Sequence, residues 1–597
     1  MADLGDFGRE DDEQTADIER GAALDTETST FETLAVDPLQ TEAEKLGSIA
    51  VSEGLVIGEV DDDINIRAYI AAEQRAAVRL GSYVVAPYPD GELLFAKMAA
   101  LEYAQEFEAD DATEIHSQRA MTSNAFDERD YKLIASLNPL AILSVDDNDE
   151  MSRRMPDRVP KPETVIRSAA DREEIKTGLA IPGEGVFLGH LAVGGERVQT
   201  AARPPTIDYR LRDDYAAGDP LVFRHTLVAG GTGSGKTHVA KNILRQYLGR
   251  RYPTGDGREP ELAIVQFDPQ DEYAQMHDGN DSLSTDRTRR FEQEGVAHGG
   301  WPATKALVPV VGNATYDGTD HRAEWLRFTI PFSMVKQHPW LVAGGSLNEN
   351  QYQGLRELLD RFFTDAGSQG TYRAFGQYLD DPVRREELHE TGRVHEATYD
   401  AIKRRVARFD HVFDQDAEPI TDLIHELVRP GGLTTIPTYH IGDSRAAESI
   451  VLAVASLLID EKLSSDPTYD RIKSTPLLVG MDEAHTYLTG AESVQATRVI
   501  GKFSDAAKQG RKERLGLFLI TQDPQDIAEP IFKQINTRIV LNLGDEGAID
   551  SLNLPRGLRG RVPYMEQGGM VIHSPDNSEP VELKGLDQCV TRHGREH

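Results

Sequence analysis

The stretch HTLVAGGTGSGKTHVAKNILRQYL, residues 225–248, decides the fold of this 597-residue chain. It reads as an apolar strand at Thr226–Ala229, a glycine-rich loop, and a helix over 238–248. Glycines let backbone N–H groups turn towards phosphate oxygens, and the helix amino terminus adds a favourable dipole. The pattern therefore predicts a phosphate-binding loop, or P-loop, made of Gly230, Gly231, Thr232, Gly233, Ser234, Gly235, Lys236 and Thr237.

The last two residues of this loop carry the chemistry. Lys236 places a point charge between the β- and γ-phosphates of a nucleotide, and Thr237 offers a hydroxyl to Mg²⁺. We therefore expect ATP and Mg²⁺ as cofactors. The alternative, a glycine-rich turn without a ligand, is disfavoured by the flanking strand and helix and by a second motif downstream.

That second motif is PLLVGMDEAH at 476–485, an apolar strand that ends in two carboxylates. Asp482 is expected to orient water around Mg²⁺. Glu483 is expected to polarise the attacking water, because in-line hydrolysis needs a positioned water more than a strong base. The alternative is a strand with a merely polar end.

Two further carboxylates follow another strand, in FDPQDEY at 267–273. Strand ends at the carboxyl edge of a parallel sheet face the ligand crevice. Asp268 is therefore a candidate metal ligand, and Glu272 a candidate for the water network. A solvated acidic turn is an equally good interpretation in so acidic a chain.

A third region, QGRKERLGLFLITQDPQ at 509–525, surrounds a core strand. Arg511, on the loop before the strand, suits a side chain that reaches the γ-phosphate of a neighbouring subunit. Gln522, at the far tip of the strand, is placed to sense the phosphate. Either residue taken alone can be an ordinary polar surface group.

The chain is predicted to be an α/β protein with a mainly parallel sheet. Near-continuous apolar strands covered on both faces are typical of such sheets; the core strands expected here are 226–229, 262–267, 477–481, 515–521 and 538–543. Short β-like runs with turn signals before residue 200, continuing through 141–145 and 185–191, predict a small N-terminal β-barrel.

These patterns divide the chain into five parts. We expect an acidic arm at 1–46, a barrel domain at 47–204, an ATPase core at 205–274 and 431–585, a helical insertion at 275–430 with helices over 350–363 and 397–413, and a C-terminal tail at 586–597.

Composition restricts the class of protein. The chain has 64 Lys and Arg against 100 Asp and Glu, for a net charge of −36, and only 17 of its basic residues are Lys. Dense carboxylates keep a protein hydrated at molar salt, which screens their repulsion, so the balance favours a halophilic protein. The alternative is an ordinary acidic protein with an acidic tail.

Other classes are excluded on composition. One cysteine, Cys589, excludes a disulfide scaffold and a thiolate zinc cluster. No apolar run approaches the roughly 20 residues of a spanning helix, and the first residues do not read as a secretion signal. We expect a cytoplasmic protein that has no membrane partner.

Taken together, these residues resemble the HerA branch of the HerA–FtsK superfamily of P-loop motor ATPases. The matches, in chain order, are Arg224-His225 before the loop, D-P-x-x-E-Y at 268–273, DEAH at 482–485, GRK at 510–512, Thr521-Gln522 and NTRIVLNL at 536–543. Two places depart from the family pattern: Gln270-Asp271 replace its usual His-Gly, and Asp523 stands where Arg is usual.

The resemblance implies a RecA-like core, a homohexameric ring with ATP between subunits, and double-stranded DNA in the pore. It also implies that Arg511, with Arg224 as a second candidate, acts on the neighbour's nucleotide. A NurA-type nuclease is the implied partner, in DNA end processing and double-strand break repair by a translocase or helicase. The alternatives are a conjugative or secretion motor and a nucleotide-gated scaffold of a defence complex.

Overall fold

The computed structural model describes most of the chain after the acidic arm. The described residues are 45–53, 65–105, 131–216, 218–254, 257–318, 320–342, 347–367, 370–390, 394–490 and 493–594. The arm expected at 1–46 lies outside them, apart from its last two residues. The chain forms two compact units: unit 1 is residues 1–180 and 197–207, and unit 2 is residues 181–196 and 208–597.

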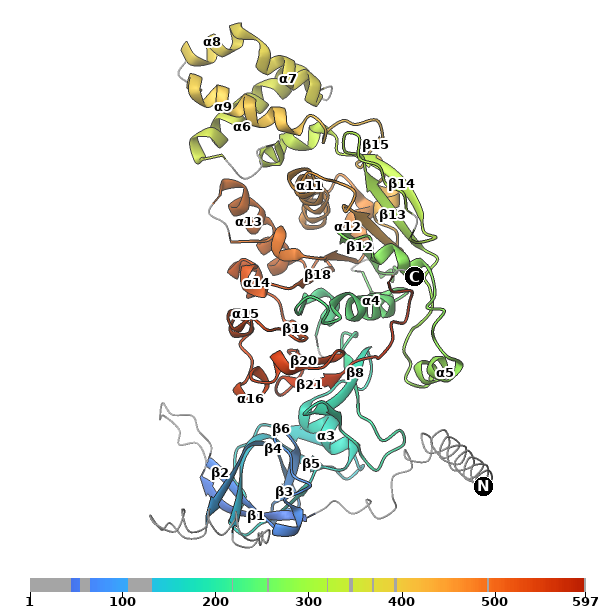
Figure 1. The fold of residues 1–597 in the computed structure, drawn as a ribbon, viewed down its shortest axis with the longest axis vertical. Helices are drawn as coiled ribbons and strands as arrows, with labels where there is room; N and C mark the ends of the chain where they lie inside the picture. The colour runs from blue at the N-terminus through green and yellow to red at the C-terminus, as the bar shows by residue number, and fades with distance from the viewer. Residues whose placement is uncertain are drawn as a thin grey trace, which may run out of the picture. The chain divides into compact units, whose positions relative to one another are not determined.

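Unit 1 contains a closed antiparallel barrel (Figure 1), which confirms the predicted β-barrel. Its strands pair in the order β2-β1-β7-β3-β4-β5, and β5 pairs again with β2, so the ring has no free edge. On β5 alternate residues, such as Leu133, Ala135 and Leu137, are buried, as expected of a strand with one face towards a barrel interior. The elements are β1 (Lys45–Glu53), β2 (Asn65–Ile70), β3 (Tyr83–Pro87), β4 (Leu93–Gln105), β5 (Tyr131–Val145), β6 (Met151–Arg154), which pairs with β5, β7 (Val165–Ser168) and α3 (Arg172–Leu179).

Unit 2 is built on one large sheet with the strand order β10-β8-β21-β20-β19-β11-β18-β17-β12-β16-β13-β14-β15. All pairings from β19 to β15 are parallel, which confirms the predicted mainly parallel sheet, and those from β10 to β19 are antiparallel. The strands are β8 (Val186–Val193), β9 (Glu196–Arg197), β10 (Asp208–Leu211), β11 (Thr226–Ala229), β12 (Ala263–Asp268), β13 (Thr304–Pro309), β14 (Glu324–Thr329), β15 (Glu418–Pro419), β16 (Leu433–Pro437), β17 (Leu477–Met481), β18 (Leu515–Thr521), β19 (Thr537–Val540), β20 (Gly569–His573) and β21 (Val581–Lys584).

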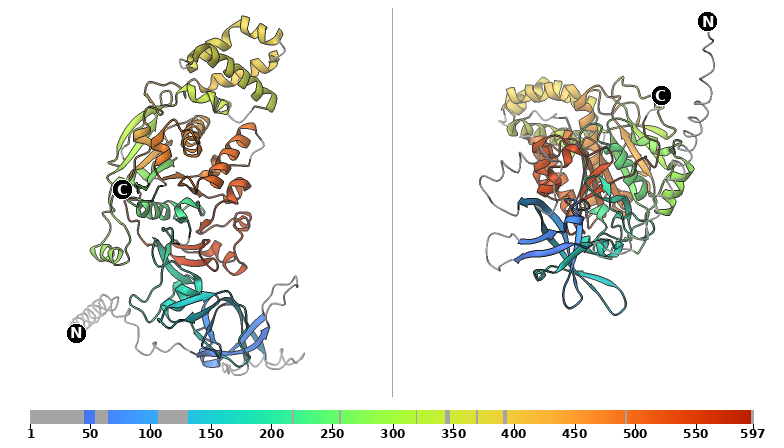
Figure 2. Two further views of the ribbon diagram at one scale, coloured as in Figure 1. Left: turned by 180° about the vertical axis from the view of Figure 1, so that it is seen from behind. Right: turned by 60° about the horizontal axis from the view of Figure 1, so that its bottom comes forward.

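Helices connect these strands, and one group of them, α6 to α9, lies at one end of the unit (Figure 1). Figures 1 and 2 show α6 to α9 grouped beyond the rest of the sheet-covering helices. The helices are α4 (Lys236–Tyr247), α5 (Thr285–Gln293), α6 (Glu349–Ala366), α7 (Tyr372–Asp380), α8 (Pro382–Glu390), α9 (Glu396–Val406), α10 (Ile424–Leu427), α11 (Ser444–Leu463), α12 (Asp470–Ser474), α13 (Val494–Gln509), α14 (Glu529–Phe532), α15 (Glu546–Ser551) and α16 (Arg556–Arg559).

The expectation that residues 185–191 continue the barrel is wrong. They form most of β8, which pairs with β10 and β21 in the large sheet. The first seven residues of β8, VFLGHLA, are all buried. A strand that is apolar on both faces needs cover on both sides, which a sheet between layers provides and a small barrel open to water on its outer face does not.

The expectation of a helical insertion over 275–430 is wrong for its first part. β13 and β14 lie within this range and extend the large sheet by parallel pairing, β13 with β16 and β14 with β13. Only the later part, α6 to α9, is a helical layer, and an aromatic cluster around Phe332, Phe362 and Phe375 joins it to the core of unit 2.

The segment expected to be a C-terminal tail, 586–597, packs onto unit 2 in its described part. Cys589, Val590 and Thr591 are buried, and the Val590 N–H donates to Asn242 Oδ1 on α4 at 2.8 Å. The chain end therefore lies across the helix that follows the P-loop.

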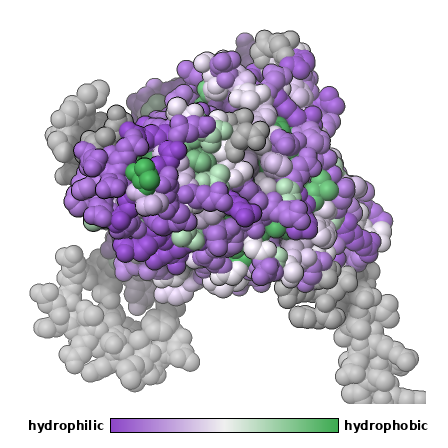
Figure 3. Space-filling model, turned by 90° about the horizontal axis from the view of Figure 1, so that it is seen from above, coloured by the Kyte–Doolittle hydropathy of each residue, from purple (hydrophilic) through white to green (hydrophobic). Residues whose placement is uncertain are grey.

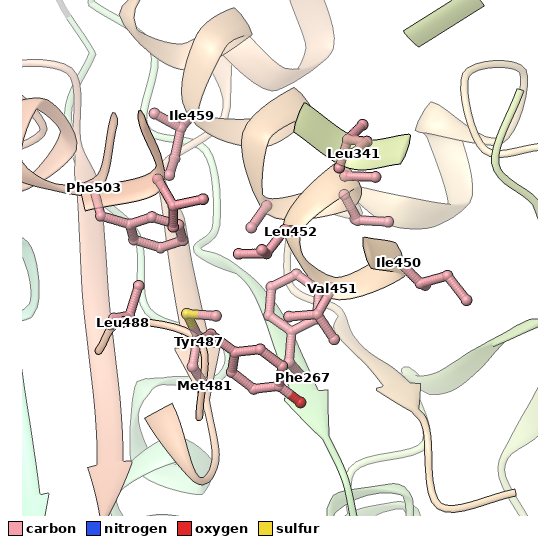
Figure 4. Packing of buried hydrophobic residues seen from close by; sticks show 14 of the residues in the cluster. Phe267, Leu341, Ile450, Val451, Leu452, Ile459, Met481, Tyr487, Leu488 and Phe503 are labelled. Atoms are coloured by element: carbon pink, nitrogen blue, oxygen red, sulfur yellow. The ribbon is translucent and has the colours of Figure 1, made fainter. Parts of the chain in front are cut away.

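The core of unit 2 is centred on α11, which is apolar around most of its circumference. Asp443 caps its amino end by accepting the Arg445 N–H at 3.0 Å. Figure 4 shows Val451 and Leu452 of this helix beside Phe267 and Met481 of the sheet. Because a helix buried all round must be enclosed, α11 lies between the sheet and the neighbouring helices.

The surface is largely polar. On the face shown in Figure 3 hydrophilic residues predominate and hydrophobic ones lie in small, separate areas. Within the described ranges, no helix combines the length and the apolar character needed to cross a membrane.

A buried histidine, His225, connects the start of β11 to β18 and α13 by hydrogen bonds. His225, just before β11, accepts the Leu517 N–H on Nδ1 at 3.1 Å, and its Nε2 lies 2.8 Å from the Ala507 carbonyl oxygen. Burial lowers the pKa of His225 to about 4. Its neutral form is therefore part of the folded structure.

This histidine predicts acid sensitivity. Its pKa is lower folded than unfolded, so its contribution to the free energy of unfolding is complete above pH 6.5 and is lost as the pH falls towards 4, by about 3 kcal/mol at most. We expect His225→Gln, whose amide can donate and accept but does not titrate, to show a smaller drop in urea midpoint between pH 7.5 and pH 5 than the unmodified chain. An equal drop in both proteins would contradict this role.

Candidate functional site

The P-loop connects β11 to α4. The helix begins at Lys236, and Gly235 before it has φ 97°, a left-handed conformation that favours glycine. Gly230 is needed for space, because a Cβ there would lie 2.5 Å from Ser234 Oγ and 3.0 Å from Leu541 Cβ. The loop is thus closed against the end of the next strand, and the Gly231 N–H donates to the Asn542 carbonyl oxygen at 2.7 Å.

Two side chains of the loop are left available for a ligand. The Lys236 ammonium donates to the Gly231 carbonyl oxygen at 3.1 Å and, within the described part of the chain, forms no ion pair. Ser234 Oγ is buried and has no hydrogen-bond partner among the described residues. A buried hydroxyl and an unpaired cation on one glycine loop suit an anionic ligand.

Asp482 and Glu483 stand at the carboxyl end of β17, as the sequence suggested for these residues. The Glu483 N–H donates to Asp482 Oδ1 at 2.9 Å, and Glu483 itself has φ 49°. This left-handed conformation is costly for a residue with a side chain and is found where the surroundings enforce it. It turns the Glu483 carboxylate towards the end of β18.

Gln522, at the carboxyl end of β18, connects this carboxylate to the P-loop. Its Nε2 donates to Glu483 Oε1 at 2.9 Å, and its Oε1 accepts the Thr232 hydroxyl at 2.8 Å. The parallel register of β11, β18 and β17 makes this possible, because it aligns the carboxyl ends of the three strands. Three residues proposed from separate motifs therefore form one hydrogen-bonded path.

Asp268 lies next to this group on β12, fully buried. Both of its oxygens accept backbone N–H groups of its own turn, from Glu272 at 3.0 Å and from Tyr273 at 2.8 Å. The Tyr273 hydroxyl donates to Asp482 Oδ2 at 3.4 Å. Asp268 thus stabilises the turn beside the site. The sequence had suggested it only as a metal ligand.

The carboxylates raise one another's pKa. Burial, then the nearby Asp271 carboxylate, raises the pKa of Asp268 to about 7. Burial, followed by repulsion from Asp268 and Glu483, raises the pKa of Asp482 to about 7. The carboxylates gathered at this end of the strands favour the binding of a cation.

Arg224 and Arg511 lie at the opposite edge of the sheet. Arg224 precedes β11 and donates to Asn536 Oδ1 at 3.2 Å. Arg511 precedes β18, is half-exposed, and pairs with Asp219 at 3.0 Å. Neither side chain contacts the P-loop of its own chain. The P-loop follows the carboxyl end of β11, and the two arginines precede the amino ends of β11 and β18, so the length of the strands separates them.

Sequence reasoning missed the residues that close the P-loop from the side of β19. Leu541 packs against Gly230, and Asn542 accepts the Gly231 N–H through its carbonyl and donates from its amide to the Met565 carbonyl oxygen at 2.8 Å. The available signal was the run NTRIVLNL, read only as a strand.

Part of the chain, including the P-loop, is similar to a known protein family. Residues 216–458 match the family model described as the central domain of helicase HerA. This segment, which is less than half of the chain, is therefore similar to that domain. It holds the P-loop and Asp268, whereas Asp482, Arg511 and Gln522 follow its end.

Two curated relatives match this chain over short stretches. The DNA double-strand break repair helicase HerA of Pyrococcus furiosus is 37% identical over 68 residues, which are 11% of this chain and 12% of the relative. The probable DNA double-strand break repair helicase HerA of Methanocaldococcus jannaschii is 32% identical over 73 residues, or 12% of this chain and 14% of the relative. The chain thus spans about an eighth of the length of these relatives in the aligned regions.

Among solved structures, VirB4 of Thermoanaerobacter pseudethanolicus has a TM-score of 0.43 and 13% identity, covering 68% of this chain and 97% of that chain. The plasmid coupling protein TrwB in complex with ADP and Mg²⁺ has a TM-score of 0.42 and 13% identity, covering 69% of this chain and 100% of that chain.

The closed P-loop yields a prediction for Gly230→Ala. The new methyl group meets Ser234 Oγ and Leu541 and forces the loop to shift, so we expect affinity for a fluorescent ATP analogue to fall by about tenfold or more. Gly442→Ala is the control, since a Cβ at this exposed position meets nothing within 4 Å. Equal affinity in the two variants would show that this loop does not bind the nucleotide.

Proposed function

We propose that this chain is an ATPase that moves along double-stranded DNA as a homohexameric ring. The observation that carries the proposal is the path from Thr232 through Gln522 to Glu483, which joins the P-loop to the carboxylate at the end of β17. Through such a path, a nucleotide bound to the P-loop can change the position of the Glu483 carboxylate.

The site residues fit ATP with Mg²⁺. The buried Ser234 hydroxyl lacks a hydrogen-bond partner in the described chain, and Lys236 lacks a counter-ion there. In the described ranges no group of three or more His, Cys, Asp or Glu side chains could hold a metal by itself. This suits Mg²⁺, which usually takes one or two protein ligands beside phosphate oxygens and water. We assign Thr237 and Asp482 to it, and Asp268 to the surrounding turn.

The hydrolytic step is assigned to Glu483. One of its oxygens is held by Gln522, while the other, Oε2, is buried and makes no hydrogen bond with the described residues. A carboxylate oxygen in that condition can accept a proton from, and so orient, a water molecule in line with the γ-phosphate. Lys236 would stabilise the negative charge on the phosphoryl oxygens, and bound Mg²⁺ would neutralise part of the rest.

The proposal of a ring is supported by the two arginines at the amino edge. Charge on the transferring phosphoryl group is commonly stabilised by an arginine supplied in trans. Arg511 and Arg224 lie at the edge away from their own P-loop, so a neighbouring chain is the one whose nucleotide they can reach. Head-to-tail contacts of this kind close into cyclic rings.

Two arguments lead us to propose double-stranded DNA as the substrate: the similarity of residues 216–458 to the HerA central domain, and the salt dependence of DNA binding. At high salt, affinity that depends on phosphate contacts collapses, because releasing counter-ions gains little. A ring that encircles the duplex does not depend on charge for its hold, which suits a chain with a net charge of −36. The resemblance to HerA leads us to propose DNA end processing with a NurA-type nuclease as partner.

The direct test is ATP hydrolysis in molar KCl with and without linear duplex DNA. We expect the duplex to stimulate turnover severalfold, Lys236→Ala to abolish binding and turnover, and Glu483→Gln to bind ATP but to lose about a hundredfold or more in turnover. Turnover that is indifferent to DNA would overturn the motor and favour a nucleotide-gated scaffold.

The ring is tested by mixing two inactive variants, Lys236→Ala and Arg511→Ala. If Arg511 acts in trans, an Arg511→Ala chain beside a Lys236→Ala chain forms one complete interface, so random mixing restores activity at up to about a quarter of the interfaces. An arginine that serves its own chain gives no recovery. Mixing each variant with itself is the control.

A further inference from the structure

His485 lies beside the proposed catalytic glutamate and has no part in the function described so far. It belongs to a short 3₁₀ helix, Ala484–Thr486, that starts directly after Glu483. Its Nδ1 lies 3.1 Å from Thr521 Oγ1 and 3.5 Å from Glu483 Oε2. The imidazole therefore faces the oxygen of Glu483 that Gln522 does not hold.

The other ring nitrogen faces a carboxylate. His485 Nε2 lies 3.8 Å from Asp523 Oδ2, and the Asp523 N–H donates to the same Thr521 hydroxyl oxygen at 3.0 Å. Asp523 directly follows Gln522, at the point where β18 ends. Residues at the end of this one strand thus act on both sides of Glu483: Gln522 donates to Oε1, and Thr521 and Asp523 contact the imidazole that lies 3.5 Å from Oε2.

His485 is the polar side chain that faces Glu483 Oε2. That oxygen is buried and has no hydrogen bond within the described residues, and the imidazole nitrogen at 3.5 Å is slightly beyond hydrogen-bond length. Catalytic hydrogen bonds are often long before the reactants are in place and tighten in the reacting complex. Here the distance from Nδ1 to Oε2 has to shorten by only ~0.3 Å to reach the upper limit of that length.

We propose that His485 and Asp523 are positioning residues for ATP hydrolysis, a role that rests on the proposed function. Asp523 and Thr521 orient the imidazole, and the imidazole fixes the second oxygen of Glu483. A carboxylate held at both oxygens presents a single orientation to water, and small misplacements of a catalytic group lower the rate steeply. The Asp523 carboxylate faces the imidazole of His485, so it acts on Glu483 through His485.

The test uses the full chain with saturating duplex DNA and compares five variants: His485→Ala, His485→Gln, Asp523→Ala, the double variant of His485→Ala with Asp523→Ala, and Asp526→Ala. Asp526 is the matched control, an exposed aspartate in the same turn, Pro524–Asp526. For each protein kcat, KM, affinity for a non-hydrolysable ATP analogue and the melting temperature are measured.

We expect His485→Ala to lower kcat about tenfold, with KM and analogue affinity unchanged within twofold. Asp523→Ala should lower kcat by less, and the double variant should be no worse than His485→Ala, because residues that act through one another are not additive. His485→Gln, which keeps a polar nitrogen near Oε2, should recover part of the loss. Asp526→Ala should match the unmodified chain.

Three outcomes separate the two claims. An unmodified chain that binds ATP but does not hydrolyse it overturns the ATPase and this inference with it. An active chain in which both single variants keep full kcat overturns the positioning role alone. Losses in Asp523→Ala and His485→Ala that multiply in the double variant, or that follow lower melting temperatures, would mean that the two residues act separately or only support the fold.

Discussion

The parallel pairing of β11, β18, β17 and β12 is the constraint on which the rest of the site depends. Each of these strands delivers a short polar segment at its carboxyl end, and their register places these segments side by side. The P-loop, Gln522, Asp482 with Glu483, and Asp268 come from four separate places in the chain. The same pairing places Arg224 and Arg511 at the opposite, amino ends of the strands, where they contact Asn536 and Asp219.

Electrostatics adds a second constraint at the carboxyl edge. Several buried carboxylates are assembled there, and burial together with mutual repulsion raises the pKa of Asp268 and Asp482 to about 7. Backbone N–H groups and the Tyr273 hydroxyl offset part of the cost by hydrogen bonding. The arrangement is typical of a site whose charge balance is completed by a ligand.

The large sheet also explains where sequence-based expectations failed. β8, β13 and β14 are short segments whose apolar residues fit a barrel, a helix or a sheet almost equally well. Their assignment depended on the partner strands, β21 for β8 and β16 for β13, which lie far away in the sequence. The packing of Val590 against α4 was hidden for the same reason, since it depends on Asn242, nearly 350 residues earlier.

By itself the sequence determined the local features of this protein: the P-loop between a strand and a helix, the carboxylates at the end of β17, the parallel core, and the residues that carry the resemblance to HerA. Glycine spacing and runs of apolar residues encode these features over a few turns of chain, so no distant partner is needed. Only the tertiary structure decided that Gln522 bridges Thr232 and Glu483, that Asp268 caps its own turn, and that His485 and Asp523 flank the second oxygen of Glu483. Those relations are set by the register of strands that are distant in sequence, and register comes from packing the whole sheet.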